Sequence, residues 1–146
     1  MFKNILLPTD GSGLPEQAIK SGVAFAKEIR AKVTGFYAQP HFYHLVFEDW
    51  PTNVLSQEQY ERIADEQAKK YLAVIERTAK AAGVPCECLS ITSEAPSEAV
   101  VKTAQDKGCD LIFMASHGRR GIRGLLLGSE TTKVLTHCKI PVLVYR

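Results

Sequence analysis

Glycines, hydroxyl side chains and arginines gather in one stretch of the chain, between residues 115 and 131. Ala115-Ser116-His117-Gly118 is followed after nine residues by Gly128-Ser129-Glu130. Glycine lets a backbone approach an anion closely and adopt positive φ, and free N–H groups at the start of a helix attract negative charge. Because an apolar run precedes this stretch, the pattern is typical of a phosphate loop that closes onto a helix, and it predicts a nucleotide site.

Charged and hydroxyl side chains in this stretch indicate how an anion would be held. Arg119, Arg120 and Arg123 supply positive charge. Ser129 has two roles open to it, since its hydroxyl can cap a helix or donate to a phosphate oxygen. Glu130 suits the first turn of a helix but would repel a close phosphate, so a divalent cation such as Mg²⁺ is considered for it. The alternative interpretation is a flexible surface loop with solvated arginines.

Asp10 and His117 are two further polar residues beside apolar runs whose side chains could act in binding or catalysis. The Asp10 carboxylate can accept a hydrogen bond from an adenine amino group or a ribose hydroxyl, or it can close an Asx turn over residues 10–13. Both roles stay open. His117 can act as an acid or base beside the predicted phosphate site, or as a hydrogen-bonding prop, which is the commoner role of a loop histidine.

Short apolar runs alternate with longer amphipathic ones along the chain, and this alternation predicts βα units and a parallel sheet. Ser56 followed by Gln59 predicts a capping box, and Gly83 and Gly108 lie where helices should end. The ligands of such sheets bind at the carboxyl ends of the strands. The predicted strands are residues 4–8, 33–38, 86–92, 111–115 and 142–145.

The composition predicts one globular α/β domain over residues 1–146. Hydrophobic residues make up 45% and charged residues 23%, and the net charge of +2 is too balanced to indicate a nucleic-acid partner. The four cysteines lack the spacing of a zinc site or a C-x-x-C pair, so we expect them to be reduced and mostly buried. No apolar run has membrane length and the first residues do not resemble a signal peptide, so we expect a cytoplasmic protein with no membrane contact.

The connection at residues 39–55 is long and rich in aromatic side chains. We consider a lid over the nucleotide, a dimer-facing flap, a partner patch, or a loop packed on itself. His41 and His44 are spaced to share a metal ion, but no clear third ligand accompanies them, so no metal site is predicted.

The chain resembles the universal stress protein family over essentially its whole length. The motifs that carry the resemblance are Leu7-Pro8-Thr9-Asp10-Gly11-Ser12, then Met114-Ala115-Ser116-His117-Gly118 with Gly128-Ser129, and Ile140-Pro141-Val142-Leu143-Val144. The ATP-binding branch has Gly, two residues, Gly, nine residues, Gly, then Ser or Thr. Ala115 stands in the first of these places. Its methyl group costs little where φ is negative and roughly 1–3 kcal/mol where it clashes, so we expect weakened rather than abolished binding.

The resemblance implies ATP or another adenine nucleotide as the ligand, with Mg²⁺ left open. It implies that Asp10 and the backbone of Ala38 contact adenine, and that Met114, Ala115 and Gly118 line the approach to the ribose and the phosphates. Gly128, Ser129, Glu130 and Thr131 would receive the phosphates. The predicted nucleotide contacts are Pro8, Thr9, Asp10, Ala38, Met114, Ala115, His117, Gly118, Arg119, Gly128, Ser129, Glu130 and Thr131.

The resemblance also implies an adenine-nucleotide α-hydrolase-like, Rossmann-like fold, with a doubly wound five-stranded parallel sheet of order 3-2-1-4-5. The strand Val142–Tyr145 would then be an apolar edge, which pairing with a second copy in a homodimer would cover. We predict an ATP-binding stress-response protein that acts by nucleotide occupancy. Because the usual phosphoryl-transfer and hydrolase motifs are missing, no dedicated enzyme is predicted. A nucleotide-free dimeric interaction module and a slow ATPase or autophosphorylating enzyme are the alternatives.

Overall fold

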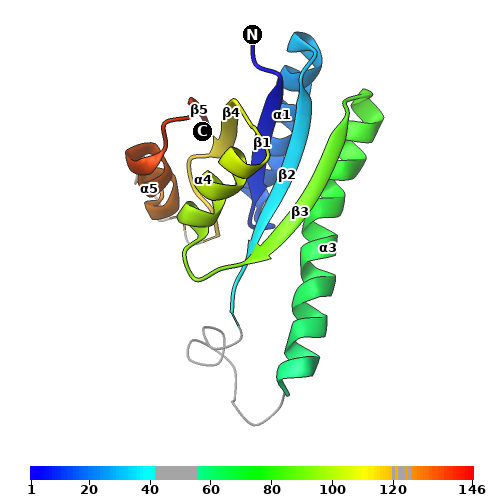
Figure 1. Ribbon diagram of the computed structural model, residues 1–146, viewed down its shortest axis with the longest axis vertical. Coiled ribbons are helices and arrows are strands. Elements are labelled where there is room, and N and C mark those ends of the chain that lie inside the picture. The colour runs from blue at the N-terminus through cyan, green and yellow to red at the C-terminus, as the bar shows by residue number, and fades with distance from the viewer. Residues whose placement is uncertain (42–55, 120, 122–123, 125) are drawn as a thin grey trace.

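Five parallel strands form one sheet in the computed structural model, and helices cover both of its faces (Figure 1). The strand order is β3-β2-β1-β4-β5, which confirms the predicted order. The structure describes residues 1–41, 56–119, 121, 124 and 126–146. The elements are β1 Asn4–Thr9, α1 Gly13–Ile29, β2 Lys32–Gln39, α3 Gln57–Ala82, β3 Cys86–Thr92, α4 Pro96–Asp106, β4 Leu111–Ala115, α5 Ser129–His137 and β5 Val142–Tyr145.

The predicted strands agree with the observed ones except at the ends of β1 and β2. β1 continues to Thr9, because Thr9 still pairs with Tyr37 of β2. β2 extends by one residue at each end, because Lys32 pairs with Asn4 and Gln39 pairs with Thr92. Backbone pairing with both neighbours therefore carries β2 beyond its apolar run.

The central strands alternate their side chains between two cores. Ile5 and Leu7 of β1 point toward α1 and α3, whereas Leu6 points toward α4 and α5, and all three are buried. Phe36 of β2 is fully buried on the same side as Leu6. Burying an apolar side chain of this size contributes about 1.5–3 kcal/mol. The sheet is thus largely apolar on both faces.

Helix ends follow the predicted signals. The Ser56 hydroxyl accepts a hydrogen bond from the Gln59 amide at 3.2 Å, and the Gln59 side chain accepts one from the Ser56 amide at 2.9 Å, so the capping box is confirmed. Gly83 caps the C-terminus of α3 with a φ of 73°, and Gly108 follows α4 with a φ of 61°. No helix in the described residues is long and apolar enough to cross a membrane.

The cysteines are more accessible than the sequence predicted. All four are free thiols, but Cys109 alone is buried, while Cys88 and Cys138 are half-buried and Cys86 is exposed. The expectation of mostly buried cysteines was wrong because β3 lies at an edge of the sheet, where a strand has a neighbour on one side. Cys86 and Cys88 both lie on this strand.

Candidate functional site

The sheet opens between β1 and β4, where the strand order reverses. β1 pairs with β2 as far as Thr9, whereas its ladder with β4 ends at Leu6, which is paired with Ile112. Pro8 follows two residues later and has no N–H to donate to a neighbouring strand. Open α/β sheets bind ligands in the crevice at such a reversal. Pro8 and Thr9 therefore lie at the carboxyl end of β1, beside this crevice, where the sequence predicted a ligand site.

Asp10 closes the turn that leaves β1. Its Oδ1 accepts hydrogen bonds from the Ser12 amide at 2.9 Å and from the Ser12 hydroxyl at 2.6 Å, which confirms the Asx turn. Its Oδ2 accepts a hydrogen bond from the Arg119 amide at 2.5 Å. An ionised carboxylate has about four acceptor positions, so one position stays available to a ligand. The contact between Asp10 and adenine stays a prediction.

Arg119 and Tyr71 join the loop after β4 to α3. The Arg119 Nη2 donates to the Tyr71 hydroxyl at 2.5 Å and to the Asp10 carbonyl at 3.3 Å, and the guanidinium carbon lies 5.8 Å from the centroid of the Tyr71 ring. The same ring packs against Gly11, whose φ is 78° and where any Cβ would overlap it. Gly11 is thus required both by its backbone conformation and by the ring beneath it.

The sequence did not identify the tyrosines of this site. Tyr37 at the end of β2 meets Tyr71 edge to face, with ring centroids 5.2 Å apart. Burial, and then the neighbouring Tyr71, raise the pKa of Tyr37 to about 12, while Arg119 opposes the shift. The Tyr37 hydroxyl therefore stays protonated at neutral pH. Tyr71 lies one helix turn from Gln67, whose side chain donates to the Tyr71 hydroxyl, and this spacing of two polar groups was the signal that could have found it.

The two matching glycines of the motif lie where a side chain would be crowded, severely at Gly118 and moderately at Gly128. A Cβ on Gly118 would overlap the Asp10 carboxylate. A Cβ on Gly128 would lie 3.2 Å from the Ser116 carbonyl oxygen and 3.4 Å from the His117 Cα. The close approach of three backbone segments therefore explains the spacing of these glycines.

Ala115 lies at the end of β4 and carries its methyl group without backbone strain. Its φ is not positive, and both it and Met114 are buried, on opposite faces of the sheet. The methyl group of Ala115 belongs to the core on the side of α1 and α3. Backbone strain is therefore not a cost of this departure from the family pattern, and its effect on binding stays a prediction.

Several main-chain amides of the loop are used within the protein. The Arg119 amide donates to Asp10, the Gly121 amide to the Gly118 carbonyl at 3.1 Å, and the Gly128 amide to the Ser116 carbonyl at 2.7 Å. The first intrahelical bond of α5 runs from the Thr132 amide to the Gly128 carbonyl at 3.0 Å. The amides of residues 129–131 precede this bond and have no intrahelical acceptor. These three amides are the ones at the start of α5 that lie outside the hydrogen-bond ladder of the helix.

Hydroxyl groups at the start of α5 have separate tasks. Gly128 is the N-cap of the helix, with no capping bond from a side chain, and Ser129 is its first residue. The capping role considered for Ser129 was therefore wrong, because a capping residue precedes the helix and Ser129 is already within it. Ser129 is exposed. The Thr131 hydroxyl is buried and donates to the Ala115 carbonyl at 3.0 Å, so it ties α5 to β4.

Glu130 stabilises the start of α4. Its Oε2 accepts a hydrogen bond from the Ser97 amide at 2.9 Å, and its Oε1 lies 2.8 Å from the Lys133 Nζ. Partial burial opposes ionisation of the carboxyl, but the hydrogen bonds from Lys133 and Ser97 outweigh it and lower the pKa of Glu130. α4 has Ala95 as its N-cap and no cap from its own side chains. Both oxygens of Glu130 thus already have partners within the protein.

We expect the Glu130→Gln substitution to lower the free energy of unfolding at pH 7 by about 0.5–2 kcal/mol, the range for losing a helix cap. Since the pKa of the folded state is the lower one, the stabilisation is present above the unfolded pKa and is lost as the pH falls through the folded value. Urea denaturation at pH 7 and at a pH below the folded value measures the difference, which should shrink in acid. Glu28→Gln, at an exposed position of α1, is the control. An equal deficit at both pH values would contradict the assignment.

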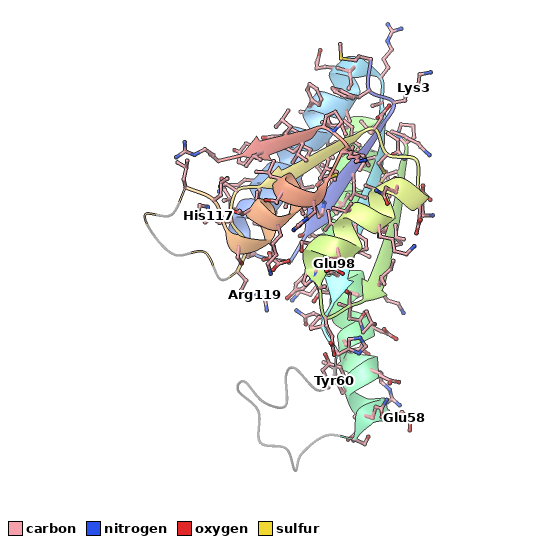
Figure 2. The ribbon with its side chains drawn as sticks, turned by 60° about the vertical axis from the view of Figure 1, so that its left-hand side comes forward. Lys3, Glu58, Tyr60, Glu98, His117 and Arg119 are labelled. Atoms are coloured by element: carbon pink, nitrogen blue, oxygen red, sulfur yellow. The ribbon has the colours of Figure 1, made fainter. Side chains whose placement is uncertain are left out.

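His117 has one ring nitrogen with a partner and one without. Its Nδ1 lies 3.0 Å from the Ser116 hydroxyl. Its Nε2 is buried and has no hydrogen-bond partner among the described residues. Figure 2 shows His117 and Arg119 on the connection that follows β4, far from Lys3 at the other end of the sheet. His117 therefore brings a polar nitrogen to the same loop as the glycines.

A cavity of about 310 Å³ adjoins this site on the side of α1 and α3. Thr9, Gly11, Ser12, Gln67 and Tyr71 are among the residues that line it. Its volume is at the low end of the range for ligand pockets. It shares Thr9 with the predicted site but lies behind the Asp10 turn.

Some features considered from the sequence lie in parts of the chain that the structure does not describe. Most of the aromatic connection at residues 39–55, Arg120 and Arg123 belong to parts of the chain that the structure does not describe. Among the residues that it does describe, no group of three histidine, cysteine, aspartate or glutamate side chains is arranged to hold a metal ion.

A sequence model of the universal stress protein family matches residues 1–146. The chain belongs to the universal stress protein family. Among its relatives, Universal stress protein MJ0577 of Methanocaldococcus jannaschii is 31% identical over 157 residues, which cover all of this chain and 96% of the relative. MJ0531 of the same organism is 30% identical over 148 residues, covering all of this chain and 83% of the relative.

Solved structures of family members share this fold. A structure of MJ0577, from a study that assigned biochemical function from structure, has a TM-score of 0.82 at 29% identity and covers 99% of this chain and 95% of that chain. A universal stress protein in complex with cAMP has a TM-score of 0.70 at 24% identity, covering 99% and 97% of the two chains. One from Archaeoglobus fulgidus in complex with dAMP has 0.65 at 15%, covering 100% and 98%.

Proposed function

We propose that this universal stress protein binds an adenine nucleotide, ATP, at the carboxyl ends of β1, β2 and β4, and that nucleotide occupancy is its role in the stress response. The observation that carries the proposal is the close approach at Gly118 and Gly128, which brings the β4–α5 loop against Asp10 and the end of β4. We also propose that the protein is cytoplasmic, because adenine nucleotides are abundant in the cytoplasm.

The base is proposed to lie between the turn after β1 and the end of β2. Thr9 pairs with Tyr37, so Ala38 is the next residue along β2 at this edge of the sheet. Asp10 has an acceptor position left for the adenine amino group or a ribose hydroxyl, and the backbone of Ala38 offers polar groups beside it. The family members in complex with cAMP and dAMP support an adenine nucleotide as the ligand class.

The phosphates are proposed to lie at the start of α5. The amides of residues 129–131 and the dipole of the helix favour an anion there. Ser129 adds an exposed hydroxyl, and His117 adds a ring nitrogen that has no other partner among the described residues. Because Glu130 is held by Lys133 and Ser97, its charge is directed away from this position. Any Mg²⁺ would be carried by the phosphates rather than by Glu130.

Calorimetric titration with ATP, in the presence and absence of Mg²⁺, tests the proposal. Mass spectrometry of the small molecules released from natively purified protein identifies a nucleotide that is carried along. We expect saturable binding of one nucleotide per chain. No heat of binding and no released nucleotide would overturn the proposal in favour of a nucleotide-free interaction module.

We propose that this protein forms a homodimer in which the β5 strands of the two chains pair. β5 lies at the edge of the sheet, and its residues Val142–Tyr145 are apolar and half-buried. An uncovered apolar edge strand tends to pair with another chain. A second copy of β5 would cover both edges at once, since a two-fold interface uses the same surface twice.

We expect the Val144→Lys substitution to convert the proposed dimer to a monomer, because an edge lysine opposes pairing between strands. Light scattering coupled to size exclusion measures the mass. Ile63→Lys, at an exposed apolar position on α3, should leave the dimer intact. A wild-type protein that is monomeric at all concentrations would refute the assembly without affecting the nucleotide proposal.

A further inference from the structure

Two thiols lie side by side at the start of β3. Cys86 and Cys88 are two residues apart on one strand, so they share a face of the sheet. Their Sγ atoms are 3.8 Å apart. Cys86 is exposed and Cys88 is half-buried. A reagent in solvent therefore meets Cys86 first, with Cys88 directly behind it.

Neighbouring β2 provides the space for this pair. Gly35 is the register partner of Cys88, and a Cβ at Gly35 would lie 2.5 Å from the Cys88 Sγ. The Ile75 side chain of α3 closes the same space, at 3.0 Å from that position. The thiol of Cys88 thus fills the place of a missing side chain on β2. This packing keeps its sulfur close to that of Cys86.

The residue between the two cysteines forms ion pairs on the other face of the strand. Glu87 is on the opposite face, where its carboxylate lies 3.8 Å from the Lys32 Nζ and 3.3 Å from the Lys107 Nζ. These contacts join β3 to β2 and to the end of α4. The two cysteines therefore stay on the same face while the sheet is folded.

We propose that Cys86 and Cys88 form a redox-active dithiol, which a hydroperoxide oxidises to a disulfide within the chain. The site is at the start of β3, whereas the proposed nucleotide site is at the carboxyl ends of the strands, so the two proposals are independent. No part of the argument uses a nucleotide.

Two steps account for all atoms and electrons. The Cys86 thiolate attacks an oxygen of the hydroperoxide, the O–O bond breaks, and an alcohol, or water from hydrogen peroxide, leaves with a proton from solvent. Cys86 is then a sulfenic acid. The Cys88 sulfur attacks the Cys86 sulfur, the S–O bond breaks, and the departing hydroxide takes the Cys88 proton as water. The two thiols lose two electrons, which reduce the peroxide.

The electrostatics of the pair fit these roles. A hydrogen bond from Cys88 lowers the pKa of Cys86 against the opposing effects of burial and of Glu76 and Glu87. The pKa of Cys88 is raised by the same interaction with Cys86, and by burial. Since the thiolate is the nucleophile, Cys86 is the attacking sulfur and Cys88 the resolving one.

The disulfide would be readily reversed. Along a strand, Cα atoms two residues apart are separated by about 6.4–6.8 Å. That separation is at the upper end of the range of about 4.4–6.8 Å for disulfides, so the bridge requires local distortion. Strained and exposed disulfides are the more easily reduced ones. A dithiol reductant should therefore restore both thiols.

The test is oxidation of the native protein with hydrogen peroxide, followed by maleimide labelling and intact mass measurement. We expect two of the four cysteines to lose their label together and to regain it after dithiothreitol. Fragmentation should place the bridge between Cys86 and Cys88. In the Cys88→Ser protein, dimedone should trap a sulfenic acid on Cys86. In the Cys86→Ser protein, thiol loss should slow by about tenfold or more, because the low-pKa thiol is gone.

Cys138→Ser is the matched control, since Cys138 is half-buried like Cys88 but lies outside the pair. This variant should form the bridge at the wild-type rate. Circular dichroism before and after oxidation checks that each variant is folded. The proposal is overturned if the folded wild type keeps all four labels, if the bridge joins two chains, or if Cys86→Ser reacts as fast as the wild type.

Discussion

The Gly128→Val protein is expected to bind ATP about 100-fold more weakly than the wild type while staying folded. A Cβ at this position lies 3.2 Å from the Ser116 carbonyl and 3.4 Å from the His117 Cα, both of which are backbone atoms that cannot rotate away. Relieving this crowding requires a shift of the start of α5, and with it of its amides. Crowding of this kind costs about 1–3 kcal/mol, and about 2.8 kcal/mol corresponds to a 100-fold change in affinity.

Calorimetry with ATP measures the loss, and circular dichroism verifies the fold. Gly13→Val makes the same change in the first turn of α1, where a Cβ meets nothing within 4 Å. It should bind ATP nearly as well as the wild type. Equal affinities for wild type and Gly128→Val, with binding present in both, would show that the phosphates do not lie at the start of α5.

The second large effect is expected on stability, from Gly11→Val. With φ of 78°, this residue has a left-handed conformation that costs a side chain about 1–2 kcal/mol. Its Cβ would also overlap the Tyr71 ring, and overpacking adds about 1–3 kcal/mol. We therefore expect the free energy of unfolding, measured with urea, to fall by about 2–5 kcal/mol, where the limits sum these two ranges.

A double-mutant cycle separates the two causes. In a Tyr71→Ala background the ring is absent, so Gly11→Val should cost only the backbone strain of about 1–2 kcal/mol. If the substitution costs the same in both backgrounds, the ring does not restrict this position. If it costs nothing in either, the left-handed conformation of Gly11 is refuted as well.

The elements of the fold were largely predictable because their signals are local. The capping box at Ser56 and Gln59 spans three residues, and the apolar strands of the sheet are continuous runs. The order of the strands came from the resemblance to the family rather than from periodicity. The ends of β1 and β2 were missed by one residue because pairing with other strands, not composition, decides where a strand stops.

The candidate site was less predictable because its contacts join distant parts of the chain. Asp10 and Arg119 are 109 positions apart, and Tyr71 and Arg119 are 48 apart. The residue types of Asp10 and Gly118 indicated polar loops, but they did not indicate that the Asp10 carboxylate would lie where a Gly118 side chain would be. Glu130 was placed among the phosphate contacts by the resemblance to the family, and its helix position suggested a divalent cation, whereas its carboxylate bonds to the start of α4. Sequence patterns within one element do not contain such partners.

The short ladder between β1 and β4 also affects how the crevice can respond to a guest. In the part of the chain that the structure describes, these strands are in register at Ile5 and Leu6. Beyond them, the bond from the Arg119 amide to Asp10 bridges the two halves of the sheet. Opening the crevice further would therefore require breaking the two hydrogen bonds that Arg119 donates to Asp10, from its amide and from its Nη2.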